Sequence, residues 1–237
     1  MNCFPKELEL NHDNIWFLDK EKINTKQIDF EYPSYTFTPR SKFYKIEGDD
    51  NYIIKINSDF IFFEEPRIKR MLKKFYDVSD KLHNINFPIA YYQENGKLKG
   101  LVIPYYDNGV SIRNIVNSNN LERFMTLYNH SDNLEDNFMY LYLEILLLLE
   151  KMYQEKISYL DIHGGNFLIY HNQIKIIDFD PRYVKLNDNK FYESYIINKY
   201  CHFINNINIS FKLKNELIFP KDNFESMENK IKRLIKK

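Results

Sequence analysis

Two aspartates and one asparagine have the types and spacing to carry out chemistry on a phosphate group. Asp161, Asn166 and Asp178 lie within residues 159–180, which read YLDIHGGNFLIYHNQIKIIDFD. Carboxylate and amide oxygens are the kind of ligand that Mg²⁺ prefers. A carboxylate can also accept the proton of a hydroxyl group. If the three side chains converge, they supply the base and the metal ligands that phosphoryl transfer requires.

Two short apolar runs are expected to position these side chains. Residues 167–169 and 174–177 flank a turn at Asn172, and this pattern predicts a small β-hairpin. Its open end then brings Asn166 and Asp178 to one place. The alternative is a polar hairpin with scattered carboxylates. That alternative requires all three polar residues to match two correctly placed strands by coincidence.

The segment resembles the catalytic loop and metal-binding segment of the protein kinase-like superfamily. The family pattern appears here as D-I-H-G-G-N-F-L-I followed by I-K-I-I-D-F-D. The resemblance implies that Asp161 is the catalytic base, and that Asn166 and Asp178 hold the Mg²⁺ ions that bridge the phosphates of ATP. It also makes His163 a candidate catalytic residue, either as a contact on the phosphate side or as a hydrogen-bonding partner within the loop.

The same resemblance implies an ATP-binding lysine and its acidic partner. Strands are predicted on both sides of the turn at 48–51, and Lys55, in I-I-K-I, falls where the family has its phosphate-binding lysine. Residues 64–82 have apolar residues at helical spacing and predict a helix. Its Glu65, or else Glu64, is expected to pair with Lys55. The alternatives are a lysine on an exposed strand face and a glutamate that only caps the helix.

A second hairpin is predicted over residues 87–106. In the family, the end of such a hairpin is the hinge whose backbone binds adenine. Here Ile103 takes the gatekeeper position, and Pro104, Tyr105 and Tyr106 form the hinge. The stretch 38–42 lacks the glycines that the family places over the phosphates.

Other departures bear on the substrate. The D-x-H-x-G-N pattern around His163 is similar to that of aminoglycoside and choline phosphotransferases, whereas the short chain favours a protein kinase. Leu160 replaces the arginine that reads activation-loop phosphates in regulated kinases. Asp180 replaces a glycine and is either a metal-proximal carboxylate or a turn residue. The preferred hypothesis is a minimal, unregulated Ser/Thr-type protein kinase; the alternatives are a small-molecule kinase and a pseudokinase that acts as an interaction module.

Length and composition set the wider expectations. The 237 residues predict an α+β, two-lobed protein kinase-like fold. Its N-terminal lobe, 1–103, holds a variable cap over 1–36 and a small antiparallel sheet, and a reduced, mainly helical C-terminal lobe spans 104–237. Lys+Arg and Asp+Glu both number 33, which argues against a nucleic-acid partner. No apolar run approaches the roughly 20 residues of a membrane span, and the expected location is cytoplasmic.

Overall fold

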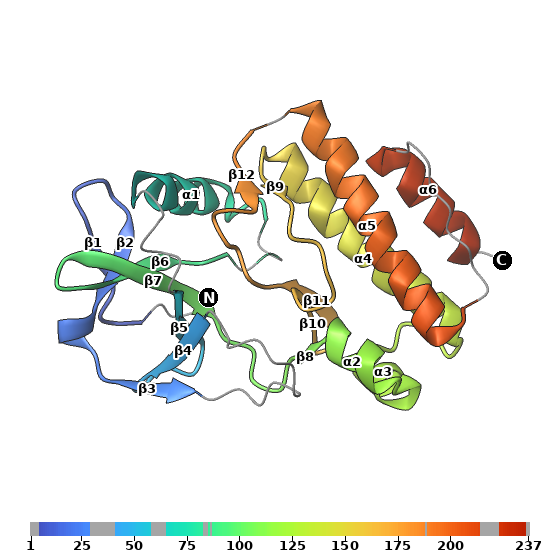
Figure 1. Cartoon of the computed structure of the whole chain (residues 1–237), viewed down its shortest axis with the longest axis horizontal. Coiled ribbons are helices and arrows are strands. Elements are labelled where there is room, and N and C mark those ends of the chain that lie inside the picture. The colour runs from blue at the N-terminus through green and yellow to red at the C-terminus, as the bar shows by residue number, and fades with distance from the viewer. Residues whose placement is uncertain are drawn as a thin grey trace. The chain divides into compact units, whose positions relative to one another are not determined.

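The computed structural model describes residues 5–28, 41–57, 65–82, 85, 87–187, 189–213 and 223–235. The fold is α+β, as predicted, with a mixed sheet of seven strands and six α-helices among these residues. The chain divides into two compact units (Figure 1). The first unit comprises Met1–Lys81 and Asn86–Asp107, and the second comprises Leu82–Ile85 and Asn108–Lys237.

The first unit is built on the seven-stranded sheet, with strand order β1-β2-β6-β7-β5-β4-β3. Its elements are β1 (Glu9–Leu10), β2 (Trp16–Asp19), the 3-10 turn η1 (Lys20–Lys22), β3 (Thr25–Ile28), β4 (Ser41–Ile46), β5 (Tyr52–Asn57), α1 (Glu65–Val78), β6 (Ala90–Glu94) and β7 (Lys97–Pro104). The strands β2 and β6 pair in parallel, whereas the other neighbours are antiparallel.

One expectation for this unit is wrong. The sheet is neither small nor wholly antiparallel, because β2 adds a parallel strand beside β6. The described part of the segment 1–36, expected as a variable cap, supplies β1, β2 and β3 of this sheet. The physical reason is apolar burial: Leu18 of β2 is fully buried in one core cluster with Tyr92 of β6. Removing that side chain from water stabilises the added strand.

The expected helix over 64–82 is confirmed as α1. Ile68, Met71, Leu72 and Phe75 recur on one face, and all four are buried. That face packs against β6, and Phe75 stacks on Phe87 with ring centroids 4.3 Å apart.

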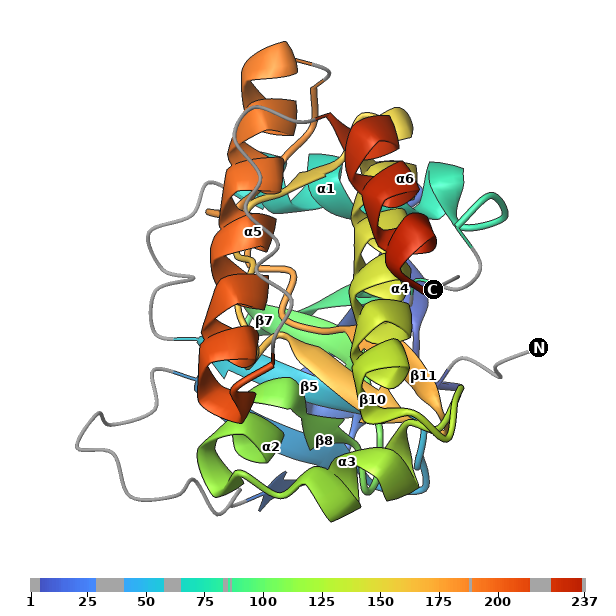
Figure 2. The same cartoon turned by 90° about the vertical axis from the view of Figure 1, so that its right-hand side faces the viewer.

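The second unit is mainly helical. Its elements are β8 (Val110–Ser111), α2 (Ile112–Ser118), α3 (Leu121–Leu127), α4 (Leu134–Gln154), β9 (Ser158–Tyr159), β10 (Phe167–Tyr170), β11 (Gln173–Ile176), β12 (Val184–Lys185), α5 (Lys190–Phe211) and α6 (Phe224–Ile235). Both α5 and α6 pack against the apolar helix α4 (Figure 2). The buried Tyr142 hydroxyl of α4 donates to Asn208 Oδ1 of α5 at 2.7 Å. No described helix has the length and apolar character needed to cross a membrane.

The predicted hairpin is confirmed as β10 and β11. The two strands pair antiparallel from Phe167 opposite Ile176 to Tyr170 opposite Gln173. His171 and Asn172 form the turn, and both have left-handed φ angles, of 48° and 59°. Two such residues make the turn type whose twist matches a β-hairpin. The open end of the hairpin therefore lies at Asn166 and Ile177.

Candidate active site

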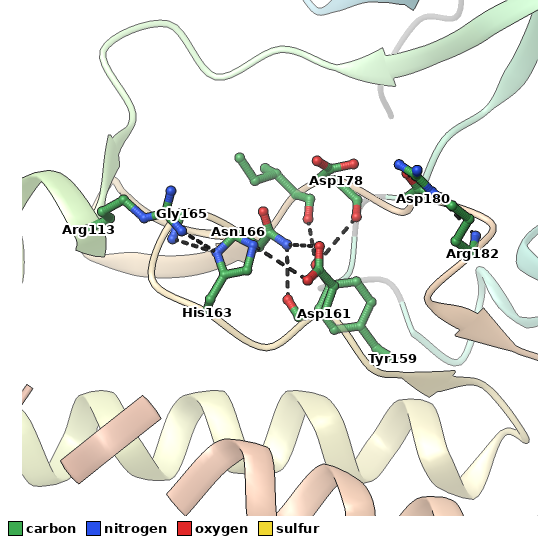
Figure 3. A network of polar contacts seen from close by, with 10 residues as sticks. Arg113, Tyr159, Asp161, His163, Gly165, Asn166, Asp178, Asp180 and Arg182 are labelled. Carbon is green, nitrogen blue, oxygen red and sulfur yellow. Dashed lines mark hydrogen bonds and ion pairs between the residues drawn. The ribbon is translucent and has the colours of Figure 1, made fainter. Parts of the chain in front are cut away.

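The open end of the β10–β11 hairpin brings Asn166 close to Asp178 in the second unit. Asn166 directly precedes β10, and Asp178 follows β11 by two residues. The Ile177 N–H donates to the Asn166 carbonyl at 2.9 Å, which fixes the two backbones side by side. Asp161 lies in the loop between β9 and β10 (Figure 3).

Asn166 holds the Asp161 carboxylate in place. Its side-chain Nδ2 donates both to the Asp161 carbonyl and to Asp161 Oδ2, each at 2.9 Å. This turns the amide oxygen of Asn166 away from Asp161. Asn166 is buried, whereas the Asp161 side chain keeps 24% of its surface exposed. The carboxylate is thus oriented and still accessible to a hydroxyl group.

Tyr159 ties the Asp161 loop to the Asp178 segment. Its hydroxyl donates to the Ile177 carbonyl at 3.0 Å and lies 3.4 Å from the Asp178 carbonyl. Complete burial raises the pKa of Tyr159 well above its usual range, and the charges of Asp178 and Asp161 raise it further. The phenol therefore remains a neutral hydrogen-bond donor. Sequence reasoning missed this role, because the partners of the hydroxyl are backbone carbonyls.

The backbone bends sharply at Asp178. This residue has a left-handed φ of 63°, which is uncommon outside glycine and asparagine. Asp180 follows, and its carboxylate accepts the Arg182 backbone N–H at 2.8 Å and the guanidinium Nη2 at 2.5 Å. Asp180 is buried, and these hydrogen bonds satisfy its carboxylate. The geometry favours its role in the turn over a metal-proximal role.

His163 is a hydrogen-bonding partner within the loop. The Gly165 N–H donates to His163 Nδ1 at 3.1 Å, and Arg113 Nη2 lies 3.1 Å from the same nitrogen. Because both neighbours of Nδ1 are hydrogen-bond donors, Nδ1 is assigned as the acceptor nitrogen of the neutral ring and Nε2 as the one that carries the proton. That Nε2 lies 3.5 Å from Asp161 Oδ1. His163 therefore faces the Asp161 oxygen that does not accept the Asn166 hydrogen bond.

The candidate ATP-binding residues lie in the first unit. Lys55 stands in β5 and is buried, so it is not on an exposed strand face. Glu65 begins α1 and pairs with Lys69, one helical turn further, at 2.6 Å. Its expected pairing with Lys55 stays a prediction. Glu64 and residues 38–40 lie outside the described residues.

The expected gatekeeper and hinge residues lie at the end of the second hairpin and just after it. Ile103 and Pro104 are the last residues of β7. The Tyr105 N–H donates to the Asn51 carbonyl at 2.7 Å, and its hydroxyl lies 3.3 Å from Asp107 Oδ1. Tyr106 comes next, immediately before the end of the unit at Asp107. The adenine-binding role of this stretch also stays a prediction.

The oxygen donors of this site decide whether it could hold Mg²⁺. No group of three or more His, Cys, Asp and Glu side chains with metal-binding geometry occurs in the part of the chain that is described. A carboxylate at Asp178 and an amide oxygen at Asn166 nevertheless fit a hard cation that takes its remaining ligands from phosphate and water. No protein-family model and no curated protein sequence matches this chain.

Proposed function

We propose that this chain is an ATP- and Mg²⁺-dependent phosphotransferase of the protein kinase-like superfamily, acting as a minimal protein kinase on a serine or threonine hydroxyl. One observation carries the proposal. Asn166 donates one hydrogen bond to the Asp161 carboxylate and one to the Asp161 backbone carbonyl, and the Ile177–Asn166 backbone bond holds Asp178 beside that pair. A base and two oxygen ligands thus share one site.

In this proposal Asp161 acts as the general base. It accepts the proton of the acceptor hydroxyl while that oxygen forms a bond to the γ-phosphorus of ATP. The bond from the γ-phosphorus to the bridging oxygen breaks, ADP leaves, and the proton passes from Asp161 to solvent. The hydrogen bond from Asn166 to Oδ2 orients the carboxylate, and this positioning is a large part of what an enzyme contributes to phosphoryl transfer.

In this scheme Asp178 and Asn166 would hold Mg²⁺. The bound ion would neutralise the charge on the transferred phosphate. The protein contributes the fixed geometry of the two oxygens. The Tyr159 hydroxyl and the Ile177–Asn166 bond both hold the Asp178 segment in place. Lys55 is assigned to the phosphates of ATP on the resemblance alone.

Activity without prior phosphorylation is part of the proposal. Leu160 stands where regulated kinases carry a phosphate-reading arginine. The Leu160 N–H donates to the Tyr183 carbonyl at 2.8 Å, and β9 pairs with β12 beside it. The segment after Asp180 is therefore attached to the loop by backbone hydrogen bonds that require no modification.

The test is transfer from labelled ATP, with separate protein and metabolite pools as acceptors. Asp161→Asn should lower transfer by roughly 10²–10⁴-fold, because that is the usual contribution of a positioned base. The matched control is Asp132→Asn, an exposed aspartate in the loop before α4. Label in the metabolite pool alone would favour a small-molecule kinase. Turnover of Asp161→Asn equal to that of the control would contradict the assignment.

A further inference from the structure

Arg113 is an exposed cation that the catalytic loop holds in place. It lies in the first turn of α2, and its backbone N–H donates to the Gly164 carbonyl at 2.9 Å. Its guanidinium Nη2 lies 3.1 Å from His163 Nδ1. Figure 3 shows the arginine reaching the His163 ring from a different segment of the chain.

Gly164 makes room for this arginine, and Gly165 makes room for both Arg113 and His163. A Cβ on Gly164 would lie 3.0 Å from the Arg113 backbone nitrogen, and a Cβ on Gly165 would lie 3.1 Å from His163 Cε1 and 3.2 Å from Arg113 Cζ. Each contact is tighter than side chains normally tolerate. The close approach of Arg113 and His163 therefore gives a physical reason for two successive glycines in the loop. These glycines were the one signal in the sequence that something packs against the loop.

The charge of Arg113 is not neutralised by a carboxylate within the described part of the chain. Its one side-chain hydrogen bond there is to the imidazole of His163, which carries no negative charge. A guanidinium has five N–H donors, and it binds carboxylate or phosphate oxygens in a two-pronged geometry. Arg113 thus keeps donors available for an anion.

The position of Arg113 relative to Asp161 indicates which anion it meets. Asp161 Oδ2 accepts from Asn166, whereas Oδ1 faces His163 Nε2 at 3.5 Å. The His163 ring therefore contacts Arg113 through one nitrogen and faces the base through the other. A group bound at Arg113 stands about one imidazole ring away from Asp161, near the hydroxyl that Asp161 would deprotonate.

We propose that Arg113 is a specificity-determining residue that binds an acidic side chain of the protein substrate close to its acceptor hydroxyl. The inference rests on the proposed function, because it names the substrate class of that same site. A substrate with lysine or arginine at that place would meet a like charge, which disfavours binding. The kinase is thus expected to prefer acidic sequences.

Binding can be measured without catalysis. Two fluorescent peptides would carry alanine in place of the acceptor serine, one with glutamates and the other with lysines at the flanking positions. Wild-type protein at low salt should bind the glutamate peptide about tenfold more tightly, as expected for one charge-assisted interaction at an exposed site. Arg113→Gln should remove this preference, and Arg113→Lys should keep part of it because the charge remains. Arg123→Gln, at an exposed arginine of the next helix, is the control and should preserve the preference.

Equal binding of both peptides by the wild type would overturn the proposal, and so would a preference that survives in Arg113→Gln. Circular dichroism would check that each variant is folded, and Arg113→Lys supplies the comparison if the glutamine variant is not. The serine forms of the peptides then test transfer separately. A glutamate preference in binding with no transfer from ATP would contradict the proposed function while leaving the acidic-peptide site in place.

Discussion

Replacing Tyr159 with phenylalanine should destabilise the second unit by about 2 kcal/mol. The substitution removes one oxygen atom from a residue that is 1% exposed and leaves its ring contact with Phe179 in place. Because the raised pKa keeps this phenol neutral, no charge is lost. The Ile177 carbonyl loses its donor at 3.0 Å. A lost hydrogen bond of ordinary strength and a partly buried acceptor left without its donor together give about 2 kcal/mol, or roughly thirtyfold in the unfolding equilibrium.

Urea unfolding followed by far-UV circular dichroism checks this value. The signal comes mostly from the helices of the second unit, whereas fluorescence of Trp16, the one tryptophan of the chain, reports on the first unit. Tyr76→Phe is the control, since that tyrosine is 64% exposed on α1 and should change stability by less than about 0.5 kcal/mol. A Tyr159→Phe effect as small as that of the control would refute the role given to this hydroxyl.

Two further substitutions test the packing and the electrostatics. Gly100→Ala should lower the free energy of unfolding measured by Trp16 fluorescence by about 3 kcal/mol, because its Cβ would lie 2.4 Å from the backbone oxygen of Lys55. The control Gly96→Ala has open space around its Cβ but a φ of 68°, and it should lower the free energy of unfolding by about 1 kcal/mol. Equal losses in the two variants would contradict the argument. The pKa of Glu150 is raised, mainly because the carboxyl group is partly buried and in addition because the charge of Glu228 is close to it. A raised carboxyl pKa means that the folded state loses stability as pH rises and the group ionises, so Glu150→Gln should be more stable than wild type at neutral pH. The difference should vanish in acid, when the wild-type carboxyl is protonated in both states, and urea titrations across pH that show a constant difference would disprove this cause.

The local elements were predictable where one short segment contained the whole signal. The β10–β11 hairpin follows from two apolar runs and Asn172, and α1 follows from four apolar residues at helical spacing. Asp161 and Asn166 are only five positions apart, so their convergence could be expected, but the hydrogen bond between their side chains was not predicted.

The parts that were missed depend on contacts between distant segments. The parallel pairing of β2 with β6 joins residues that have no shared pattern in the sequence. The N-terminal strands are short, from two to four residues, and β3 is largely exposed, so alternation of apolar residues is weak there. Arg113 reaches the His163 loop only through the fold, across 50 positions of sequence. Its role could be found only from the geometry around Gly164 and Gly165.

The most direct test of the central claim is calorimetric binding of ATP in the presence and absence of Mg²⁺, with wild-type protein and Asp178→Ala. A methyl group cannot replace a carboxylate as a metal ligand. The account predicts that the wild type binds ATP in a Mg²⁺-dependent manner and that Asp178→Ala loses the dependence on Mg²⁺. Asp132→Asn should bind as the wild type does. An Asp178→Ala variant with unchanged Mg²⁺-dependent affinity for ATP would contradict the metal-binding role and, with it, the proposed site.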